Sequence, residues 1–250
     1  MHLPFGAGDI ALMLIVTAMA VGMAYVPSPR AKSMLYMLPL PFTAAMLATG
    51  QSVDATHMCG MTAIWLYPWV AWLMHGRLGL HIILASGAAL GIHTSLSLAL
   101  ARIIPSSGAS EQACFWSVWV VALAAGGLAL LVPARREASH RSALPAYLKV
   151  PLVLLLVAGV VMLKEQLRGF MPTFPFATVF AVYESRRSLH TLASRFPIFL
   201  VGFLPMIVAC RWAIPAWGHA AGLAAGWAVY LPVYIGLDRL RERRRGVTAP

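Results

Sequence analysis

The stretch LPLPFTA, residues 38–44, places two prolines inside an apolar segment of helical length. A near copy, MPTFPFAT, occupies residues 171–178. Proline removes a backbone donor and frees the carbonyl one turn earlier, and a lipid bilayer supplies no partner for either group. Two such stretches in one hydrophobic chain therefore predict two interrupted helices whose polar backbone faces protein or a polar cavity.

The composition sets the class of protein. Of the 250 residues, 60% are hydrophobic and 11% are charged, and the mean hydropathy is +0.77. Soluble domains carry about 25% charged residues, so too little charge is present to coat a water-soluble surface. Several uncharged apolar runs reach the roughly 17–25 residues needed to cross a bilayer. The expected fold class is all-α, a polytopic membrane helix bundle without a cofactor or a bound metal.

We expect nine membrane spans. The first is a retained span and not a signal peptide, because the N-terminal residues MHLPFGAGD lack a basic region. The predicted spans cover about residues 9–26, 34–50, 58–75, 79–102, 113–132, 148–163, 169–184, 195–212 and 217–237.

The basic residues predict the orientation. With the N-terminus outside, inner segments hold fifteen of them: Arg30, Lys32, Arg77, Arg135, Arg136, Arg141, Lys149, Arg186, Arg187, Arg195 and the five arginines of 239–245. Outer segments hold four: Arg102, Lys164, Arg168 and Arg211. This positive-inside bias favours an N-out, C-in protein of a bacterial-type inner membrane. It also explains the net charge of +11 without nucleic acid, and lets the tail bind anionic lipid headgroups.

The two proline stretches align at an offset of 134 residues, Pro41 with Pro175. Each follows a span and a short basic loop, and two further spans follow each. The polar turn after the first stretch, residues 50–57, lacks basic residues, whereas its counterpart at 184–190 contains two arginines. Equivalent turns with opposite charge predict an inverted repeat. The expected units are a four-helix repeat, a linker span with a basic loop, a second four-helix repeat and a basic tail: 1–103, 104–147, 148–237 and 238–250.

Each half resembles the small GlpM-type inner-membrane proteins. The resemblance rests on PLPFTAA (39–45) and PTFPFATV (172–179), which are similar to the F-P-T-F-A stretch of those proteins. It covers both halves but neither the linker span nor the tail. It implies a fused, antiparallel version of an obligate pair and supplies no activity.

Paired interruptions in two inverted halves are typical of a transporter's binding site. We therefore expect a substrate site near the two breaks, although the prolines are expected toward the span ends. The predicted solute is small and neutral, zwitterionic or weakly amphipathic. The residues assigned to this site are Pro39, Pro41, Thr43, Pro172, Thr173, Pro175 and Thr178. The alternative is that these prolines only kink their helices.

Four ionisable residues complete the candidate site. His93 lies deepest in a span, where such residues are costly and usually functional; the alternative is a histidine bonded to a neighbouring helix. Glu184, Arg186 and Arg187 lie at an inner end, where simple ion pairing would explain them. Arg211 is expected to extend to the surface.

The sequence leaves open whether one cluster of soft-metal ligands binds anything. His57, Met58, Cys59 and Met61 are residue types that bind soft metals, but methionine is common in this chain and chance clustering explains the group. Trp65, Trp69 and Trp72 share a helix face that is expected to anchor or pack.

Three functions remain possible from the sequence. A small-molecule transporter, in which two inverted halves rock around the breaks, is favoured. An intramembrane enzyme or binder for lipid-linked or anionic-lipid substrates at the inner face is the second, and a non-catalytic subunit of a membrane complex is the third. The expected partners are membrane lipid and a solute, with a homodimer or a complex partner left open.

Overall fold

The computed structural model describes residues 6–26, 29–106, 108–131, 146–162, 164–167 and 170–247. All regular structure in these residues is helical, which confirms the all-α prediction. The predicted inner basic residues Arg135, Arg136 and Arg141, and the outer Arg168, lie outside the described residues.

The helices follow one another along the chain. They are α1 (Ala7–Tyr25), α2 (Pro29–Tyr36), α3 (Leu40–Thr49), α4 (Ala55–Trp72) with a π-helical turn η1 (Leu73–Arg77), α5 (Ile82–Ser106), α6 (Glu111–Ala129), α7 (Ala146–Met162), α8 (Lys164–Leu167), α9 (Phe176–Glu184) and α10 (Leu189–Val247).

The long α10 consists of two arms. Gly218, at φ 80° and ψ 169°, is non-helical and separates residues 189–217 from 219–247. A positive φ of this kind is open to glycine and strained for other residues. Small residues let the arms approach: a Cβ on Gly222 would lie 2.6 Å from Ile214, and one on Gly226 would lie 2.4 Å from the Cys210 sulfur.

Helices that could cross a membrane by length and composition are present among the described residues. Three are long and apolar enough to cross a bilayer: Ile82–Ile104, Glu111–Ala129 and Leu189–Arg243. Three shorter apolar helices cover Ala7–Gly22, Ser33–Thr49 and Val150–Met162. By length and composition alone, fewer helices qualify than the nine predicted spans. One reason is that the second predicted span is divided into α2 and α3, and the described part of the seventh contains only the nine-residue α9 as α-helix.

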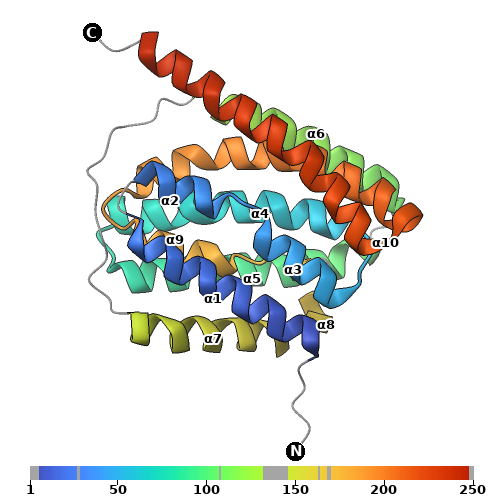
Figure 1. Cartoon of the computed structure of the whole chain (residues 1–250), viewed down its shortest axis with the longest axis horizontal. Helices are drawn as coiled ribbons and strands as arrows, with labels where there is room; N and C mark the ends of the chain where they lie inside the picture. The colour runs from blue at the N-terminus through green and yellow to red at the C-terminus, as the bar shows by residue number, and fades with distance from the viewer. Residues whose placement is uncertain are drawn as a thin grey trace, which may run out of the picture.

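The helices lie side by side, and their connections gather at two ends of the bundle (Figure 1). At one end α1, η1, α6 and α9 finish and α2, α5, α7 and α10 start. At the other end α3, α5, α7 and the first arm of α10 finish and α4 and α6 start (Figure 1). The packing is between α4 and α5, between α1 and both α3 and α7, and between α10 and both α4 and α6.

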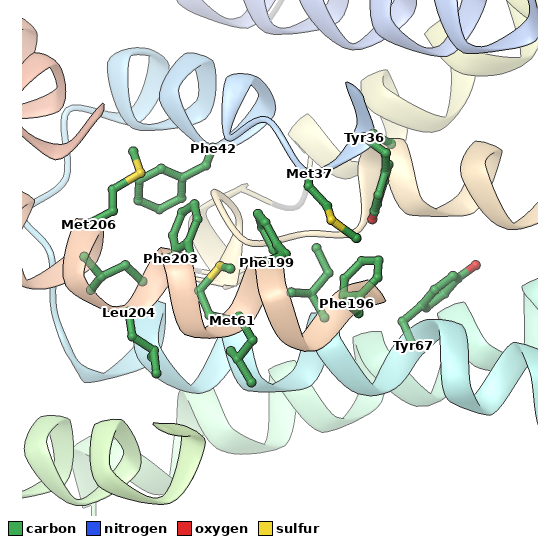
Figure 2. Close-up of a cluster of buried hydrophobic side chains, with 14 of the residues drawn as sticks. Tyr36, Met37, Phe42, Met61, Tyr67, Phe196, Phe199, Phe203, Leu204 and Met206 are labelled. Carbon is green, nitrogen blue, oxygen red and sulfur yellow. The ribbon is translucent and has the colours of Figure 1, made fainter. Parts of the chain in front are cut away.

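The main core fills the space between α2–α3, α4 and the first arm of α10 (Figure 2). It is rich in aromatic residues and methionine. Phe42 meets Phe203 edge to face at 4.9 Å between ring centroids, and Phe199 lies 5.1 Å from Phe203. This core holds the first proline break against α10.

Candidate functional site

The prolines start new helices instead of kinking continuous ones. Pro39 caps α3 and Pro175 caps α9, with nearly equal dihedral angles of φ −76°, ψ 34° and φ −74°, ψ 46°. The first turn of a helix needs no amide donor, so proline is tolerated there. In the structure, Pro39 therefore occupies the position equivalent to Pro175. The sequence alignment paired Pro41 with Pro175 instead, so the two pairings differ by two residues.

The first break also lies deeper than expected. It separates α2, of eight residues, from α3, of ten, so it divides the segment near its middle. The expectation that the prolines lie toward the span ends was wrong for this segment, because the true helical segment begins at Pro29 and not at residue 34. Figure 1 shows the start of α3 and the start of α9 both in the central part of the bundle.

The two breaks meet around one small cavity of about 40 Å³. A water molecule takes up about 30 Å³ of liquid volume, so this space suits one or a few waters. The lining comes from both breaks, α4, α9 and α10: Tyr36, Leu38, Pro39, Pro41, Phe42, Met61, Ile64, Pro172, Thr173, Phe174, Ala177, Thr178 and Phe199.

The carbonyl that Pro41 frees receives a new donor. Residue 37 is one turn before Pro41, and the Tyr230 hydroxyl of the second arm of α10 donates to the Met37 carbonyl. The Thr43 hydroxyl donates to the Pro39 carbonyl at 2.8 Å and accepts from the Trp227 indole at 2.9 Å. The second arm of α10 thus supplies the polar groups that the broken backbone needs.

In the second break, the backbone groups form their hydrogen bonds mainly within tight turns. The Phe174 amide donates to the Met171 carbonyl, one turn before Pro175, at 3.1 Å. The Thr173 hydroxyl donates to the Phe170 carbonyl at 3.2 Å. The break packs directly on α4, where a Cβ on Gly60 would lie 1.9 Å from the Thr173 hydroxyl oxygen. Only glycine at position 60 permits this approach.

One hydrogen bond joins the two halves at the cavity. The Tyr36 hydroxyl, at the end of α2, donates to the Thr178 hydroxyl in the first turn of α9. Both side chains are buried. The contact links residues 142 positions apart and forms part of the cavity wall.

Five of the predicted site residues line this cavity: Pro39, Pro41, Pro172, Thr173 and Thr178. Thr43 and Pro175 belong to the same breaks but lie outside the lining. Thr43 is engaged by Trp227, and Pro175 caps α9. The structure therefore brings the two predicted stretches together, as the symmetric placement of the prolines indicated.

His93 lies behind the cavity wall. Its ring meets the lining residue Phe174 edge to face at 5.6 Å between centroids. The side chain is 3% exposed, and the backbone of Ala63 lies near it, but neither ring nitrogen has a hydrogen-bond partner in the described part of the chain. His93 therefore packs against the backbone of the neighbouring α4 and does not line the cavity itself.

The other three predicted residues lie apart from the cavity, at the end of α9. Glu184 is buried there, and Arg187 is exposed. The guanidinium of Arg186 donates to the Tyr183 carbonyl at 3.3 Å and lies 5.0 Å from the Tyr183 ring centroid. The explanation of Glu184 by simple ion pairing with these arginines stays a prediction.

The sequence reading missed the aromatic side chains of the cavity, Tyr36, Phe42, Phe174 and Phe199. Phe42 and Phe174 are next to a proline in sequence and Tyr36 lies three residues before Pro39, and this was the available signal. Phe199 comes from α10, and no local pattern marks it. Only the tertiary packing brings it against the breaks (Figure 2).

The bundle end opposite the start of α10 carries a polar cluster that was also missed. Arg211 forms a bidentate pair with Glu111 at 2.6 and 2.8 Å and donates to the Val53 carbonyl at 3.2 Å. Its guanidinium lies 4.2 Å from the Phe115 ring centroid. Arg211 extends toward the bundle end as expected, and its side chain, which is 20% exposed, pairs there with Glu111 at the start of α6.

His57 has a structural role in the same cluster. Asp54 caps α4, and the His57 ring lies 2.8 Å from the Asp54 carboxylate in a capping box. Burial alone raises the pKa of Asp54, but hydrogen bonds from His57 and Thr56 outweigh it and bring the pKa to about 2. No group of three His, Cys, Asp or Glu side chains suited to a metal lies together in the described residues.

Two of the three tryptophans of α4 pack together. The Trp69 and Trp72 rings meet at 5.8 Å, and each meets the His190 ring, at 6.0 and 5.6 Å. These contacts join α4 to the start of α10, in keeping with the packing role expected for them.

The chain matches no protein-family model, no curated protein and no solved structure. The resemblance to GlpM-type proteins therefore rests on the proline stretches alone and stays a prediction.

Proposed function

We propose that this protein is a small-molecule membrane transporter whose solute site lies where the two proline breaks meet. One observation carries the proposal: breaks from two different parts of the chain close around a single cavity in the middle of the bundle. Paired helix interruptions of this kind are used by transporters with inverted repeats.

The directions of the helices support two inverted halves. In Figure 1 α1 and α7 run in opposite directions, as do α3 and α9, α4 and the first arm of α10, and α5 and the second arm. The linker α6 contacts both α4 and α10. Among the described residues, the segments that we assign to the nine predicted spans are α1, α2–α3, α4, α5, α6, α7, α9 and the two arms of α10.

The same arrangement supports the proposed orientation. The bundle end that carries the start of α10 also carries η1 with Arg77 and the turn with Arg186 and Arg187. The opposite end carries Arg211 and the turn of residues 50–54. We place the first of these ends in the cytoplasm and the protein in an inner membrane of bacterial type.

The cavity in its present form is too small for a solute of several heavy atoms. Passage therefore requires α2–α3 and α9 to separate, which breaks the Tyr36–Thr178 hydrogen bond. The Arg211–Glu111 pair ties the outer end of α10 to α6 and, through Val53, to the segment before α4. If the bundle opens toward its outer end, these contacts of Arg211 with Glu111 and Val53 must break.

Cysteine accessibility tests the proposal without knowledge of the solute. Cys59, Cys114 and Cys210 are replaced by alanine, and Thr173→Cys or Thr178→Cys is introduced into the full chain. A charged, membrane-impermeant methanethiosulfonate is then added to right-side-out and to inside-out vesicles. A transporter predicts labelling of these cysteines from both sides.

The other functions give different labelling. An enzyme that opens only to the inner face predicts labelling from that side alone, and a rigid complex subunit predicts none. Leu155→Cys on α7 is the control, because Leu155 is 73% exposed on the outer surface of the bundle and faces acyl chains under the proposal. Labelling of the cavity cysteines from one side or neither would refute the transporter.

A further inference from the structure

The cavity between the breaks has an unusual lining for a polar solute. Four aromatic rings, those of Tyr36, Phe42, Phe174 and Phe199, take part in it. None of the described residues that line it has an acidic or basic side chain. An anion would find no cation there, and a metal ion would find no carboxylate.

The hydroxyl groups of the described lining are few, and only those of Tyr36 and Thr178 become free when the breaks part. The Tyr36 hydroxyl bonds to Thr178, and the Thr173 hydroxyl bonds to the Phe170 carbonyl. A solute with many hydroxyl or N–H groups would leave several of them unpaired in an apolar site, at a cost of about 1–3 kcal/mol each. Sugars and primary ammonium ions therefore fit poorly.

Aromatic faces carry a negative quadrupole that attracts a cation, and quaternary ammonium groups are recognised in this way. A methylated ammonium has no N–H to satisfy, and its charge is spread over apolar methyl groups. We propose that the solute is a small quaternary ammonium compound whose head is held by the rings of Tyr36, Phe42, Phe174 and Phe199. This inference rests on the proposed transport function and names its substrate class.

The two breaks explain how such a head could enter. At about 40 Å³ the cavity must widen to hold it. Among the described residues, the Tyr36–Thr178 hydrogen bond joins the two breaks, so its opening parts the walls while each ring stays on its own element. Phe199 belongs to α10, which is packed against α4 and gives the site a fixed wall.

Binding is tested on the purified full chain in dodecyl maltoside. The probes are tetramethylammonium chloride, choline chloride and 3,3-dimethylbutan-1-ol, the neutral isostere of choline, with sodium chloride at equal ionic strength. Tryptophan fluorescence on heating gives the midpoint of unfolding. We expect the two ammonium compounds to raise the midpoint in a saturable manner and the neutral isostere and sodium chloride to leave it unchanged.

Variants locate the site. Phe174→Leu and Phe199→Leu should each weaken tetramethylammonium binding by about 3- to 30-fold, the range of one cation–π contact. Phe203→Leu is the matched control, because Phe203 lies one turn beyond Phe199 in the same core but outside the cavity lining (Figure 2). It should bind the probe as the unmodified protein does.

The outcomes separate the two proposals. Equal binding of choline and its neutral isostere, or equal losses in Phe199→Leu and Phe203→Leu, overturns the substrate class. Absence of any ammonium binding, together with labelling of Thr173→Cys from both sides, overturns the substrate class and leaves transport standing. If neither ammonium binding nor labelling from both sides is observed, both proposals are overturned. The comparison of the probes uses the unmodified chain, so it does not depend on the folding of any variant.

Discussion

Gly60→Ala tests the contact between the second break and α4. A Cβ at this position lies 1.9 Å from the Thr173 hydroxyl oxygen, 2.9 Å from the Thr173 Cβ and 3.1 Å from a ring carbon of Phe170. The Thr173 side chain has to move out to the 3.4 Å of an ordinary contact, and its bond to the Phe170 carbonyl resists this. Overpacking of this kind costs about 1–3 kcal/mol.

The matched control is Gly91→Ala on α5, where an added Cβ meets nothing within 4 Å. Both changes share the gain of about 1 kcal/mol that alanine gives a helix over glycine. The free energy of unfolding, from SDS titration in dodecyl maltoside, should therefore be lower for Gly60→Ala than for Gly91→Ala by about 1–3 kcal/mol. Thr173→Ala removes the closest atom and should recover part of the loss, as a coupling of about 0.5–3 kcal/mol. Equal stability of the two alanine variants would refute this placement of the break.

Three further predictions concern polar contacts that hold the fold. Tyr230→Phe removes the donor to the buried Met37 carbonyl and should cost about 1–3 kcal/mol in SDS unfolding; an unchanged transition would show that the carbonyl has another partner. Arg195→Met leaves buried Asp238, now 3.1 Å from the guanidinium, without this partner and should cost about 3–5 kcal/mol. Adding Asp238→Leu should restore most of it, and failure to do so would contradict the pairing. The pKa of Asp54 is about 2 in the fold against 3.8 in the free residue, so its contribution is complete above about pH 4 and lost as the pH falls through 2. Between these pH values, the thermal unfolding midpoint of Asp54→Asn should change less with pH than that of the unmodified protein. An identical pH dependence of the two midpoints would contradict the capping box.

The proline stretches were predictive because their effect is local. A missing amide donor interrupts a helix wherever the residue lies, and the repetition of the pattern indicated that the two interruptions belong together. The same reasoning placed Thr173 and Thr178 at the site. It could not place the first break correctly, since the start of α2 at Pro29 falls in a basic segment that hydropathy assigns to a loop.

The missed features depend on residues distant in sequence. Arg211 meets Glu111 across 100 positions, and Phe199 reaches the first break only because α10 packs beside it. The separation of Glu184 from the cavity follows from the length of α9: six residues at about 1.5 Å each put Glu184 roughly 9 Å along the axis from Thr178. Hydropathy and charge do not encode these distances.

The central claim is that the two breaks lie against each other inside the bundle. Tyr36→Cys and Thr178→Cys, introduced together into the chain without native cysteines, can be treated in detergent with dibromobimane, which fluoresces strongly only after both of its ends react. The account predicts a fluorescent cross-link in this pair and none when Tyr36→Cys is combined with Leu155→Cys. Efficient labelling of each single cysteine without a cross-link between Tyr36→Cys and Thr178→Cys would contradict it.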